Sequence, residues 1–347
     1  MTTPDWEWVQ SKLDVLMEHA DELKEISPVT EEPDPEFGAW TALKLEVLVA
    51  SVDVYTKIMS SHDYTYYFVD AMSGPGVVDI DDRPESLIGS PIIAGTVAHE
   101  PFHRMYLIEK DRDRAEALRD RLDYAAEEIP EFTQSRDSCV VINENANDVL
   151  PNLSSRIEDD HPTLLQGTGE SGGQHHLAFI DNVSHDVDFE SIRQLESIPG
   201  DLLINYPNTV LSRRAGNIES QDDPDWGEFD AFFDNRTEAR DHDEDDRFAL
   251  YLELLETIKR GDTVNLPIRA SREYPYYYRM IYATRDRDGG GGFLNFMESY
   301  SERMSGLTGD DVERIFKTMR GELTNLDHWT EKDTDTDDDQ SGLGDFD

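Results

Sequence analysis

Short apolar runs alternate along the chain with longer segments in which apolar residues recur at helical spacing. Short apolar runs closed by turn residues are typical of buried parallel strands. The predicted strands lie at 65–71, 105–109, 139–142, 177–181 and 201–205. Because helical segments separate them, the pattern predicts parallel strands joined by right-handed crossovers. The aromatic and β-branched segment 276–283 predicts a late strand, antiparallel to the others.

Helical segments flank these strands at both ends of the chain. Two are predicted before the first strand, at 6–26 and 39–60, and two after the last, near 293–304 and 309–322. The predicted fold class is therefore α/β, with a doubly wound, mostly parallel, Rossmann-like sheet and helical N-terminal and insertion segments.

The domain organisation follows from the same pattern. We expect 1–60 to form helices packed on a main domain at 61–325. Within that domain, 212–246 is an acidic insertion whose aromatic residues either pack onto the domain or form a lid over substrate; they are Trp226, Phe229, Phe232 and Phe233. The glycine-rich segment 166–174 predicts an exposed loop. Residues 330–347 are acidic and almost without large apolar side chains, which predicts disorder.

A cofactor motif follows the first predicted strand. That strand ends in Asp70 and turns on Gly74 and Gly76, which let a ligand approach the backbone closely. In doubly wound folds, nucleotide-like cofactors bind at this turn. The second strand ends in Glu109, a carboxylate that can accept both hydroxyls of a ribose. The D-x-x-x-G-x-G form favours S-adenosylmethionine over a dinucleotide, although any parallel strand can end in an acid and a glycine turn.

Local signals place the helices around this motif. Residues 77–88 are interpreted as an acidic loop, and the next helix is predicted to begin at Ser90-Pro91, a good cap followed by proline at the first helical position. Asp111 is predicted to cap the helix that follows the second strand.

Several segments together resemble the three-Cys-motif partner proteins. They are Trp40 with Leu43-Lys44-Leu45, Tyr67-Phe68-Val69-Asp70, Ser73-Gly74-Pro75-Gly76, Gly89-Ser90-Pro91, Ile108-Glu109, Phe179-Ile180-Asp181 and Asp201-Leu202-Leu203-Ile204-Asn205-Tyr206-Pro207. The resemblance covers roughly 40–292 and implies a Rossmann-like methyltransferase sheet, S-adenosylmethionine as cofactor and a partner protein encoded nearby. Because the family is named for a genomic neighbour, its label describes the fold better than a reaction.

The third and fourth strands end in further candidate site residues. Asn145 is placed to accept from an adenine amino group, but 143–148 could equally cap the helix predicted at 148–157. Asp181 follows the fourth strand, where amino-methyltransferases that act on adenine or cytosine have (Asp/Asn)-Pro-Pro-aromatic. Asn182 replaces the proline that stiffens such a loop, which argues against methylation of a base.

Two functional hypotheses follow. In the first, the chain is a methyltransferase of unknown acceptor, nucleic acid included, in which Asp181 positions the acceptor or removes its proton and Tyr206 lies nearby. In the second, it is a non-catalytic partner module that retains the fold. The glycine turn and Glu109 favour the first hypothesis, and the altered Asp181-Asn182 sequence favours the second.

The net charge of the chain indicates the solvent conditions it is suited to rather than its chemistry. The chain has 76 acidic and 31 basic residues, for a formal charge of −45, and only eight lysines. Concentrated salt screens such self-repulsion, so this composition is typical of proteins from extreme halophiles. The alternative is an acidic protein with basic partners, but here the acids are dispersed along the chain. The acidity therefore says little about nucleic acid as a substrate.

Other residue types limit the remaining function classes. The single cysteine, Cys139, excludes an internal disulfide and a cysteine-based zinc site, and is predicted to pack in the core. His175-His176 and His185 flank the fourth strand and could be metal ligands with Asp181. Adjacent histidines in a glycine-rich loop are more often exposed to solvent, so no metal is expected. Arg213-Arg214 is interpreted as a solvated pair, with an anionic substrate as the alternative. Neither a signal peptide nor a membrane span is visible, so a cytoplasmic location is expected.

Overall fold

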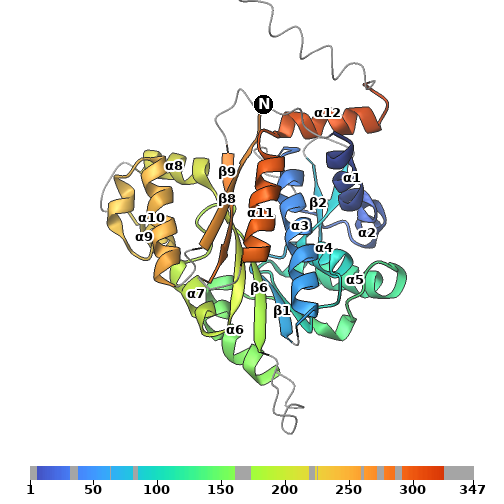
Figure 1. The fold of residues 1–347 in the computed structure, drawn as a ribbon, viewed down its shortest axis with the longest axis horizontal. Coiled ribbons are helices and arrows are strands. Elements are labelled where there is room, and N and C mark those ends of the chain that lie inside the picture. The colour runs from blue at the N-terminus through green and yellow to red at the C-terminus, as the bar shows by residue number, and fades with distance from the viewer. Residues whose placement is uncertain are drawn as a thin grey trace, which may run out of the picture.

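The computed structural model describes residues 6–31, 38–62, 64–80, 85–160, 173–218, 223–224, 226–258, 262–271, 277–285 and 291–323. Its centre is a seven-stranded sheet with the order β5-β4-β1-β6-β7-β9-β8 (Figure 1). The strands are β1 (Thr65–Asp70), β4 (Arg104–Ile108), β5 (Cys139–Ile142), β6 (Gln174–Asp181), β7 (Gly200–Tyr206), β8 (Asp262–Arg269) and β9 (Tyr277–Thr284).

The sheet is mostly parallel and doubly wound, as predicted. The first five of these strands pair in parallel, and β9 runs antiparallel to both β7 and β8. From β1 the chain moves outward through β4 to β5 and then returns to the other side of β1 to form β6 and β7. The strand order therefore reverses between β1 and β6, which is the usual ligand position in open α/β sheets.

The pattern of apolar residues did not predict β8. Its sequence contains Pro267, and a proline within an apolar run argues against a central strand. Because β8 is the edge strand of the sheet, its outer side needs no ladder hydrogen bond, and proline is tolerated there.

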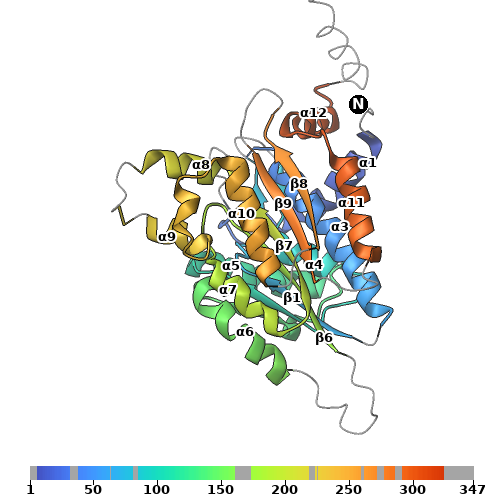
Figure 2. The same cartoon turned by 60° about the vertical axis from the view of Figure 1, so that its left-hand side comes forward.

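Helices cover both faces of the sheet (Figures 1 and 2). One face carries α1 (Trp6–Met17), α2 (Ala20–Ile26), α3 (Thr41–Ser60), α4 (Ser90–Val97), α5 (Arg112–Glu128), α11 (Gly291–Met304) and α12 (Gly309–Met319). The other carries α6 (Ala146–Asp160), α7 (Phe189–Gln194), α8 (Asn208–Asn217), α9 (Trp226–Phe232) and α10 (Glu244–Thr257). Successive strand residues point to opposite faces of the sheet, and each face has its own hydrophobic core. Phe68 belongs to the first core, on the side of α3, and Val69 to the second, on the side of α6.

Several local predictions are confirmed. The helix after the glycine turn begins at Ser90 with Pro91 in its first turn. Asp111 caps α5 by accepting a hydrogen bond of 2.9 Å from the backbone N–H of Arg114. Cys139 is buried in the core, and burial raises the pKa of its thiol to about 12.

The interpretation of 77–88 as an acidic loop was wrong at both ends of that segment. Val77–Asp79 (β2) and Ser86–Ile88 (β3) pair as an antiparallel ribbon. Val77, Leu87 and Ile88 are buried in the first core, while the Asp79 carboxylate accepts from Lys24 at 2.6 Å and from Thr30 at 2.7 Å. Burial of these three apolar residues outweighs the acidic composition of the segment.

The insertion packs onto the main domain. Its four predicted aromatic residues are buried in the second core, and the Phe232 ring stacks on Tyr251 with the centroids 5.0 Å apart. Figure 2 shows α8, α9 and α10 as a lobe beside the sheet. The predicted tail at 330–347 lies outside the described residues, as does most of the glycine-rich segment 166–174.

Candidate functional site

Four polar side chains meet at the carboxyl edge of the sheet, beside the point where the strand order reverses. Asp70 ends β1, Glu109 follows β4, Asp181 ends β6, and Asn205 is the second-last residue of β7. Parallel strands present their carboxyl ends at the same edge, so residues far apart in the sequence converge here. The three acids predicted from strand ends therefore surround one site.

The glycine turn after β1 lies against the start of α4. Gly74 and Gly76 have φ angles of +60° and +85°, a left-handed conformation that favours glycine. The N–H of Gly89 donates to the Gly76 carbonyl at 2.8 Å, and a Cβ on Gly89 would lie only 3.0 Å from the Gly76 carbonyl carbon. This packing buries both glycines of the turn, and each of them lines a cavity.

The Glu109 carboxylate is held in place by the backbone. The N–H of Gly74 donates to Oε2 at 3.0 Å, and the N–H of Asp111 donates to Oε1 at 2.7 Å. The Asn143 side chain donates to the Glu109 carbonyl at 2.9 Å, which fixes the strand end. A carboxylate has about four acceptor positions, so two remain for hydroxyl groups in the cavity that Glu109 lines.

Asp70 lies beneath the turn rather than in a cavity. Its side chain is fully buried, and its Oδ1 accepts from the N–H of Met72 at 3.3 Å. Burial raises the pKa of Asp70 to about 7, against the lowering effect of hydrogen bonds from Ser90 and Met72. Asp70 lines neither cavity, and its hydrogen bonds connect it to Ser90 and to the turn.

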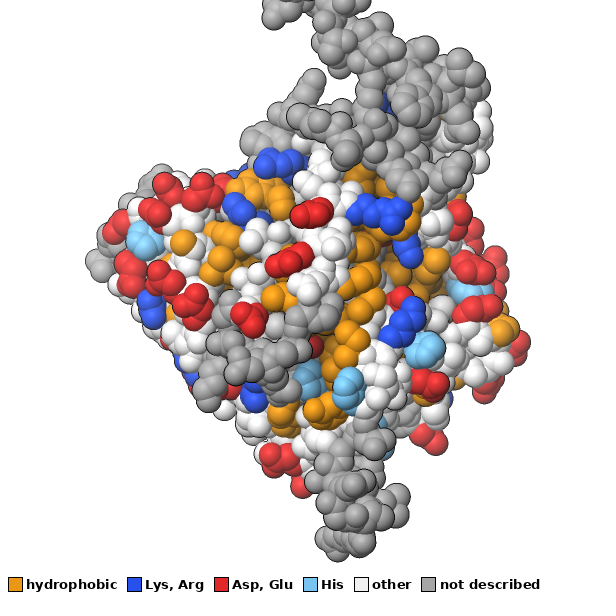
Figure 3. Space-filling model, viewed as in Figure 1, with side chains coloured by type: hydrophobic (Ala, Val, Ile, Leu, Met, Phe, Trp, Pro, Cys, Tyr) orange, Lys and Arg blue, Asp and Glu red, His pale blue; other side chains and the backbone are white. Residues whose placement is uncertain are grey.

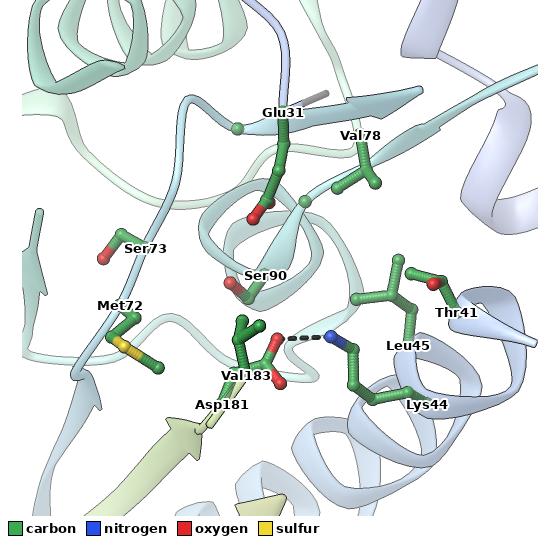
Figure 4. Close-up of a pocket in the computed structure, with 12 residues that line it drawn as sticks. Glu31, Thr41, Lys44, Leu45, Met72, Ser73, Val78, Ser90, Asp181 and Val183 are labelled. Carbon is green, nitrogen blue, oxygen red and sulfur yellow. Dashed lines mark hydrogen bonds and ion pairs between the residues drawn. The ribbon is translucent and has the colours of Figure 1, made fainter. Parts of the chain in front are cut away.

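Two adjoining cavities open at this edge. The larger, of about 130 Å³, is lined by Glu31, Ala71, Met72, Gly74, Glu109, Lys110, Arg114, Asn145, Ala146, Asp181, Val183 and Asp186. The smaller, of about 50 Å³, is lined by Glu31, Thr41, Lys44, Leu45, Met72, Ser73, Gly76, Val78, Gly89, Ser90, Asp181 and Val183 (Figure 4). Four residues line both cavities and mark their junction: Glu31, Met72, Asp181 and Val183.

Asp181 is the centre of a polar cluster at that junction. The Lys44 ammonium donates to Asp181 Oδ2 at 2.5 Å (Figure 4), and the Asn205 amide donates to Oδ1 at 3.0 Å. Only 7% of the Lys44 side chain and 18% of the Asp181 side chain are exposed. The carboxylate is therefore held from two sides while one edge faces the cavities, an arrangement that can orient a ligand or accept a proton.

Asn182 braces the loop after β6 in place of the missing proline. Its amide donates to the Asn205 carbonyl at 3.3 Å, its Oδ1 accepts from the Val187 N–H at 3.2 Å, and its own carbonyl accepts from Asn205 at 2.8 Å. Asn182 is fully buried, so water does not compete with these hydrogen bonds. The change from proline therefore does not leave the loop without support.

Tyr206, predicted beside Asp181, lies on the opposite face of the sheet. Neighbouring strand residues point to opposite faces, so Asn205 reaches Asp181 while Tyr206 points into the second core. Its ring packs 5.1 Å from that of Tyr251, and it lines neither cavity. The position of Tyr206 therefore does not agree with the predicted catalytic role. Its ring packs between the sheet and the aromatic residues of the insertion.

Of the two roles weighed for Asn145 from the sequence, the structure shows the one at the start of α6. It lines the larger cavity, and its Oδ1 accepts from the Asn147 N–H at 2.9 Å at the start of α6. The helix begins earlier than predicted, at Ala146. An adenine contact through the Asn145 amide remains a prediction.

His175 and His176 were predicted to be exposed in a loop, and this was wrong. His175 and His176 belong to β6 and are buried, and the Tyr55 hydroxyl lies 2.9 Å from His175 Nδ1. Buried His185 lies after β6, with its Nε2 3.2 Å from Glu228 of the insertion. Among the described residues, no cluster of three or more His, Cys, Asp and Glu side chains is placed to hold a metal ion.

Sequence reasoning missed Glu31 and Lys44 as site residues. Both precede β1, and neither lies near a strand end in the sequence. One feature of the sequence could have indicated a special role for Lys44. Residues 42–49 are apolar except for Lys44 and Glu46. A charge in such a run is unfavourable unless the fold brings it a partner.

The fold is thus a doubly wound, mostly parallel, Rossmann-like sheet, with the candidate site at the switch point. No protein-family model matches the chain, and no curated protein matches its sequence. In the part of the chain that the structure describes, no helix has both the length and the apolarity to cross a membrane.

Solved structures with similar folds are distant. A Legionella pneumophila protein of the DUF519 family is 11% identical with a TM-score of 0.43, covering 73% of this chain and 89% of that one. The O-methyltransferase TomG from Streptomyces achromogenes, in complex with S-adenosylmethionine, is 15% identical with a TM-score of 0.35, over 69% and 79%. A predicted O-methyltransferase from Agrobacterium tumefaciens is 13% identical with a TM-score of 0.34, over 76% and 97%. Likenesses this distant transfer no activity to the chain.

Proposed function

We propose that the chain is an S-adenosylmethionine-dependent methyltransferase whose acceptor enters beside Asp181. The observation that carries this proposal is the pair of joined cavities at the switch point, with Glu109 lining one cavity and Asp181 lining both. Sites of this kind, at the carboxyl ends of parallel strands, suit a ligand with a ribose.

The residues present fit the cofactor. Glu109 has acceptor positions left for the ribose hydroxyls, and Gly74 and Gly76 line the larger and the smaller cavity, respectively. The lining carboxylates, with Asp181 and Glu31 at the junction, suit a ligand that carries positive charge. When bound, S-adenosylmethionine would supply a sulfonium methyl group, whose carbon an acceptor lone pair would attack while the C–S bonding electrons leave with the neutral thioether.

Asp181 supplies what such a displacement needs from the protein. Methyl transfer requires the nucleophile to be aligned with the methyl group and to lose its proton. Asp181 is fixed by Lys44 and Asn205, so it can accept a hydrogen bond from the acceptor and receive that proton. The brace at Asn182 keeps this carboxylate in position.

The finer assignments belong to the same proposal. The segments from Trp40 to Pro207 support membership of the three-Cys-motif partner group, in which a partner protein would help to present the acceptor. The dispersed acidity supports a halophilic origin. Loss of the proline after Asp181 favours an acceptor other than a base amino group.

Calorimetry with S-adenosylmethionine in molar potassium chloride tests the cofactor site. Glu109→Ala should weaken binding by about 1–3 kcal/mol, because buried hydroxyl contacts to a carboxylate are lost. The exposed Glu144, replaced as Glu144→Ala, is the matched control and should bind as the wild type does. Equal affinity in Glu109→Ala and wild type would place the cofactor elsewhere.

Activity separates the methyltransferase from the partner module. Extracts of nucleic acid and protein are screened for transfer of labelled methyl groups by the wild-type chain. Labelling supports the enzyme, whereas cofactor binding without any labelled acceptor would favour the non-catalytic module.

A further inference from the structure

Glu31 enters the site from outside the main sheet. Its N–H donates to the Val77 carbonyl at 3.1 Å, and its carbonyl accepts from the Asp79 N–H at 3.3 Å, so it is bridged to the β2 strand of the small ribbon. Its Oε2 lies 3.0 Å from the position that a Cβ on Gly74 would take. Figure 4 shows its carboxylate pointing into the cavity, toward Ser90 and Asp181.

The junction of the two cavities is where the sulfur of the proposed cofactor must lie. Glu109 marks the larger cavity as the ribose side, and the remaining part of the ligand extends into the smaller one. In S-adenosylmethionine the sulfur joins the adenosine, the methionine chain and the methyl group. The junction is lined by Glu31, Met72, Asp181 and Val183, and the two charged residues among these are carboxylates.

Of these two carboxylates, Glu31 has the weaker protein counter-charge. Asp181 is paired with Lys44 at 2.5 Å, whereas the nearest contact of Glu31 with a cation joins its Oε1 to Arg114 Nη1 at 3.9 Å. Burial raises the pKa of Glu31, nearby Asp181 and Glu109 also raise it, and Lys44 and Arg114 lower it. A cation at the junction would therefore meet a carboxylate that lacks a close partner.

We propose, on the basis of the proposed function, that Glu31 selects the charged cofactor by placing its carboxylate beside the sulfonium. S-adenosylhomocysteine, the product, has the same ribose, ammonium and carboxylate, but its sulfur is a neutral thioether. Glu31 attracts the substrate form and loses that attraction once the methyl group has left. The residue thereby favours exchange of product for fresh cofactor.

The test compares three ligands with three proteins in molar potassium chloride. S-adenosylmethionine, S-adenosylhomocysteine and sinefungin, which has a protonated amine in place of the methylsulfonium, are titrated into wild type, Glu31→Gln and Glu144→Gln. The substitution at Glu31 is nearly isosteric, and Glu144 is an exposed glutamate whose replacement removes the same charge away from the cavities.

The readout is the ratio of affinities for S-adenosylmethionine and S-adenosylhomocysteine. Glu31→Gln should lower this ratio at least tenfold, with sinefungin affected like S-adenosylmethionine, and Glu144→Gln should leave it unchanged. A ratio that stays constant in Glu31→Gln while both ligands still bind would overturn the inference and leave the proposed function standing. Failure of the wild type to bind either ligand would overturn both.

Discussion

At the scale of single residues, the site depends on how charges are paired. Lys44 and Asn205 hold the Asp181 carboxylate, and two backbone N–H groups hold Glu109. Both carboxylates keep free acceptor positions toward the cavities that they line. The site is therefore preorganised by groups that do not have to move when a ligand enters.

Replacement of Asp181 should separate chemistry from cofactor binding. Asp181→Ala removes the group proposed to orient the acceptor, so turnover should fall about 100-fold or more, the usual scale for a positioned acid or base. Affinity for S-adenosylmethionine should change much less, because Glu109 remains. Transfer of labelled methyl is measured beside calorimetry, with the exposed Asp148→Ala as control. Undiminished labelling in Asp181→Ala would remove this residue from the reaction.

The buried carboxylate of Glu46 should affect the stability of the fold rather than the candidate site. Its side chain is completely buried in α3, and neither of its carboxylate oxygens has a hydrogen-bond partner within the described part of the chain. Burial raises its pKa well above the ordinary value of 4.5, against a small opposing effect of Lys12. The folded state thus binds a proton that the unfolded state releases, so this group makes the protein less stable as the pH rises above 4.5.

Glu46→Gln should remove that dependence. The amide has no charge to bury, so the variant should be more stable than wild type by about 1–3 kcal/mol at pH 8, with the gain shrinking toward pH 5. Chemical denaturation at several pH values in molar salt measures this, with Glu144→Gln as the surface control. If Glu46→Gln is no more stable than wild type at pH 8, or if its gain in stability is the same at pH 5 and pH 8, the burial argument is contradicted.

The residues that could be predicted from the sequence are those whose position depends on a strand end. Asp70, Glu109 and Asp181 close apolar runs, and parallel strands bring their carboxyl ends together whatever the packing. Glu31 and Lys44 reach the site only because α3 and the β2–β3 ribbon pack against it. Tyr206 was predicted at the site but lies away from it. It is one residue from Asn205, and neighbouring residues of a strand point to opposite faces of the sheet.

At the scale of elements, α4 links the glycine turn to the core. The helix begins at Ser90, which lines the smaller cavity, and it carries Gly95 against the ring of Phe132. A Cβ on Gly95 would overlap with the atoms of that ring. The close contact explains a glycine in the middle of a helix, where propensity alone would favour alanine.

Gly95→Ala should therefore destabilise the protein, although it raises helix propensity. Overpacking of this kind costs about 1–3 kcal/mol. Gly216 in α8 is the matched control, because a Cβ on Gly216 would have no other atom within 4 Å, and Gly216→Ala should stabilise by roughly 0.5–1 kcal/mol. Thermal unfolding of both variants gives the comparison. Stabilisation of Gly95→Ala to the same extent as Gly216→Ala would show that Phe132 yields without cost.

Helices and strands could be predicted where apolar residues recur regularly. The prediction failed where the apolar pattern is short or interrupted. The central strands and α3 follow from continuous apolar runs. The ribbon β2–β3 has three residues in each strand, too few to show a period, and β8 contains Pro267. Residues 6–26 form two helices, α1 and α2, rather than the single segment that the spacing indicated.

At the scale of the whole molecule, the dominant property is the excess of carboxylates. Acidic side chains lie over the insertion lobe and over the opposite side of the face shown in Figure 3, with fewer basic ones between them. A formal charge of −45 on 347 residues repels itself when the chain is compact. We therefore expect counterions to stabilise the folded chain.

Stability should rise with salt for this reason. Screening shortens the Debye length to ~3 Å at 1 M, so most of the gain should appear between dilute and about 1 M potassium chloride. Each kcal/mol of relief raises the melting temperature by roughly 2–4 °C for a domain of this size class, and we expect a rise of at least about 5 °C.

Calorimetric scans in potassium chloride, with sucrose at matched osmolarity as the uncharged comparison, separate screening from general exclusion of solutes from the protein surface. Sucrose strengthens burial without screening charge, so it should raise the melting temperature less than the salt does. Equal effects of salt and sucrose would assign the stabilisation to exclusion. A melting temperature that stays flat or falls as salt increases would rule out the halophile account, because the repulsion of 76 acidic residues would then have no measurable effect on folding.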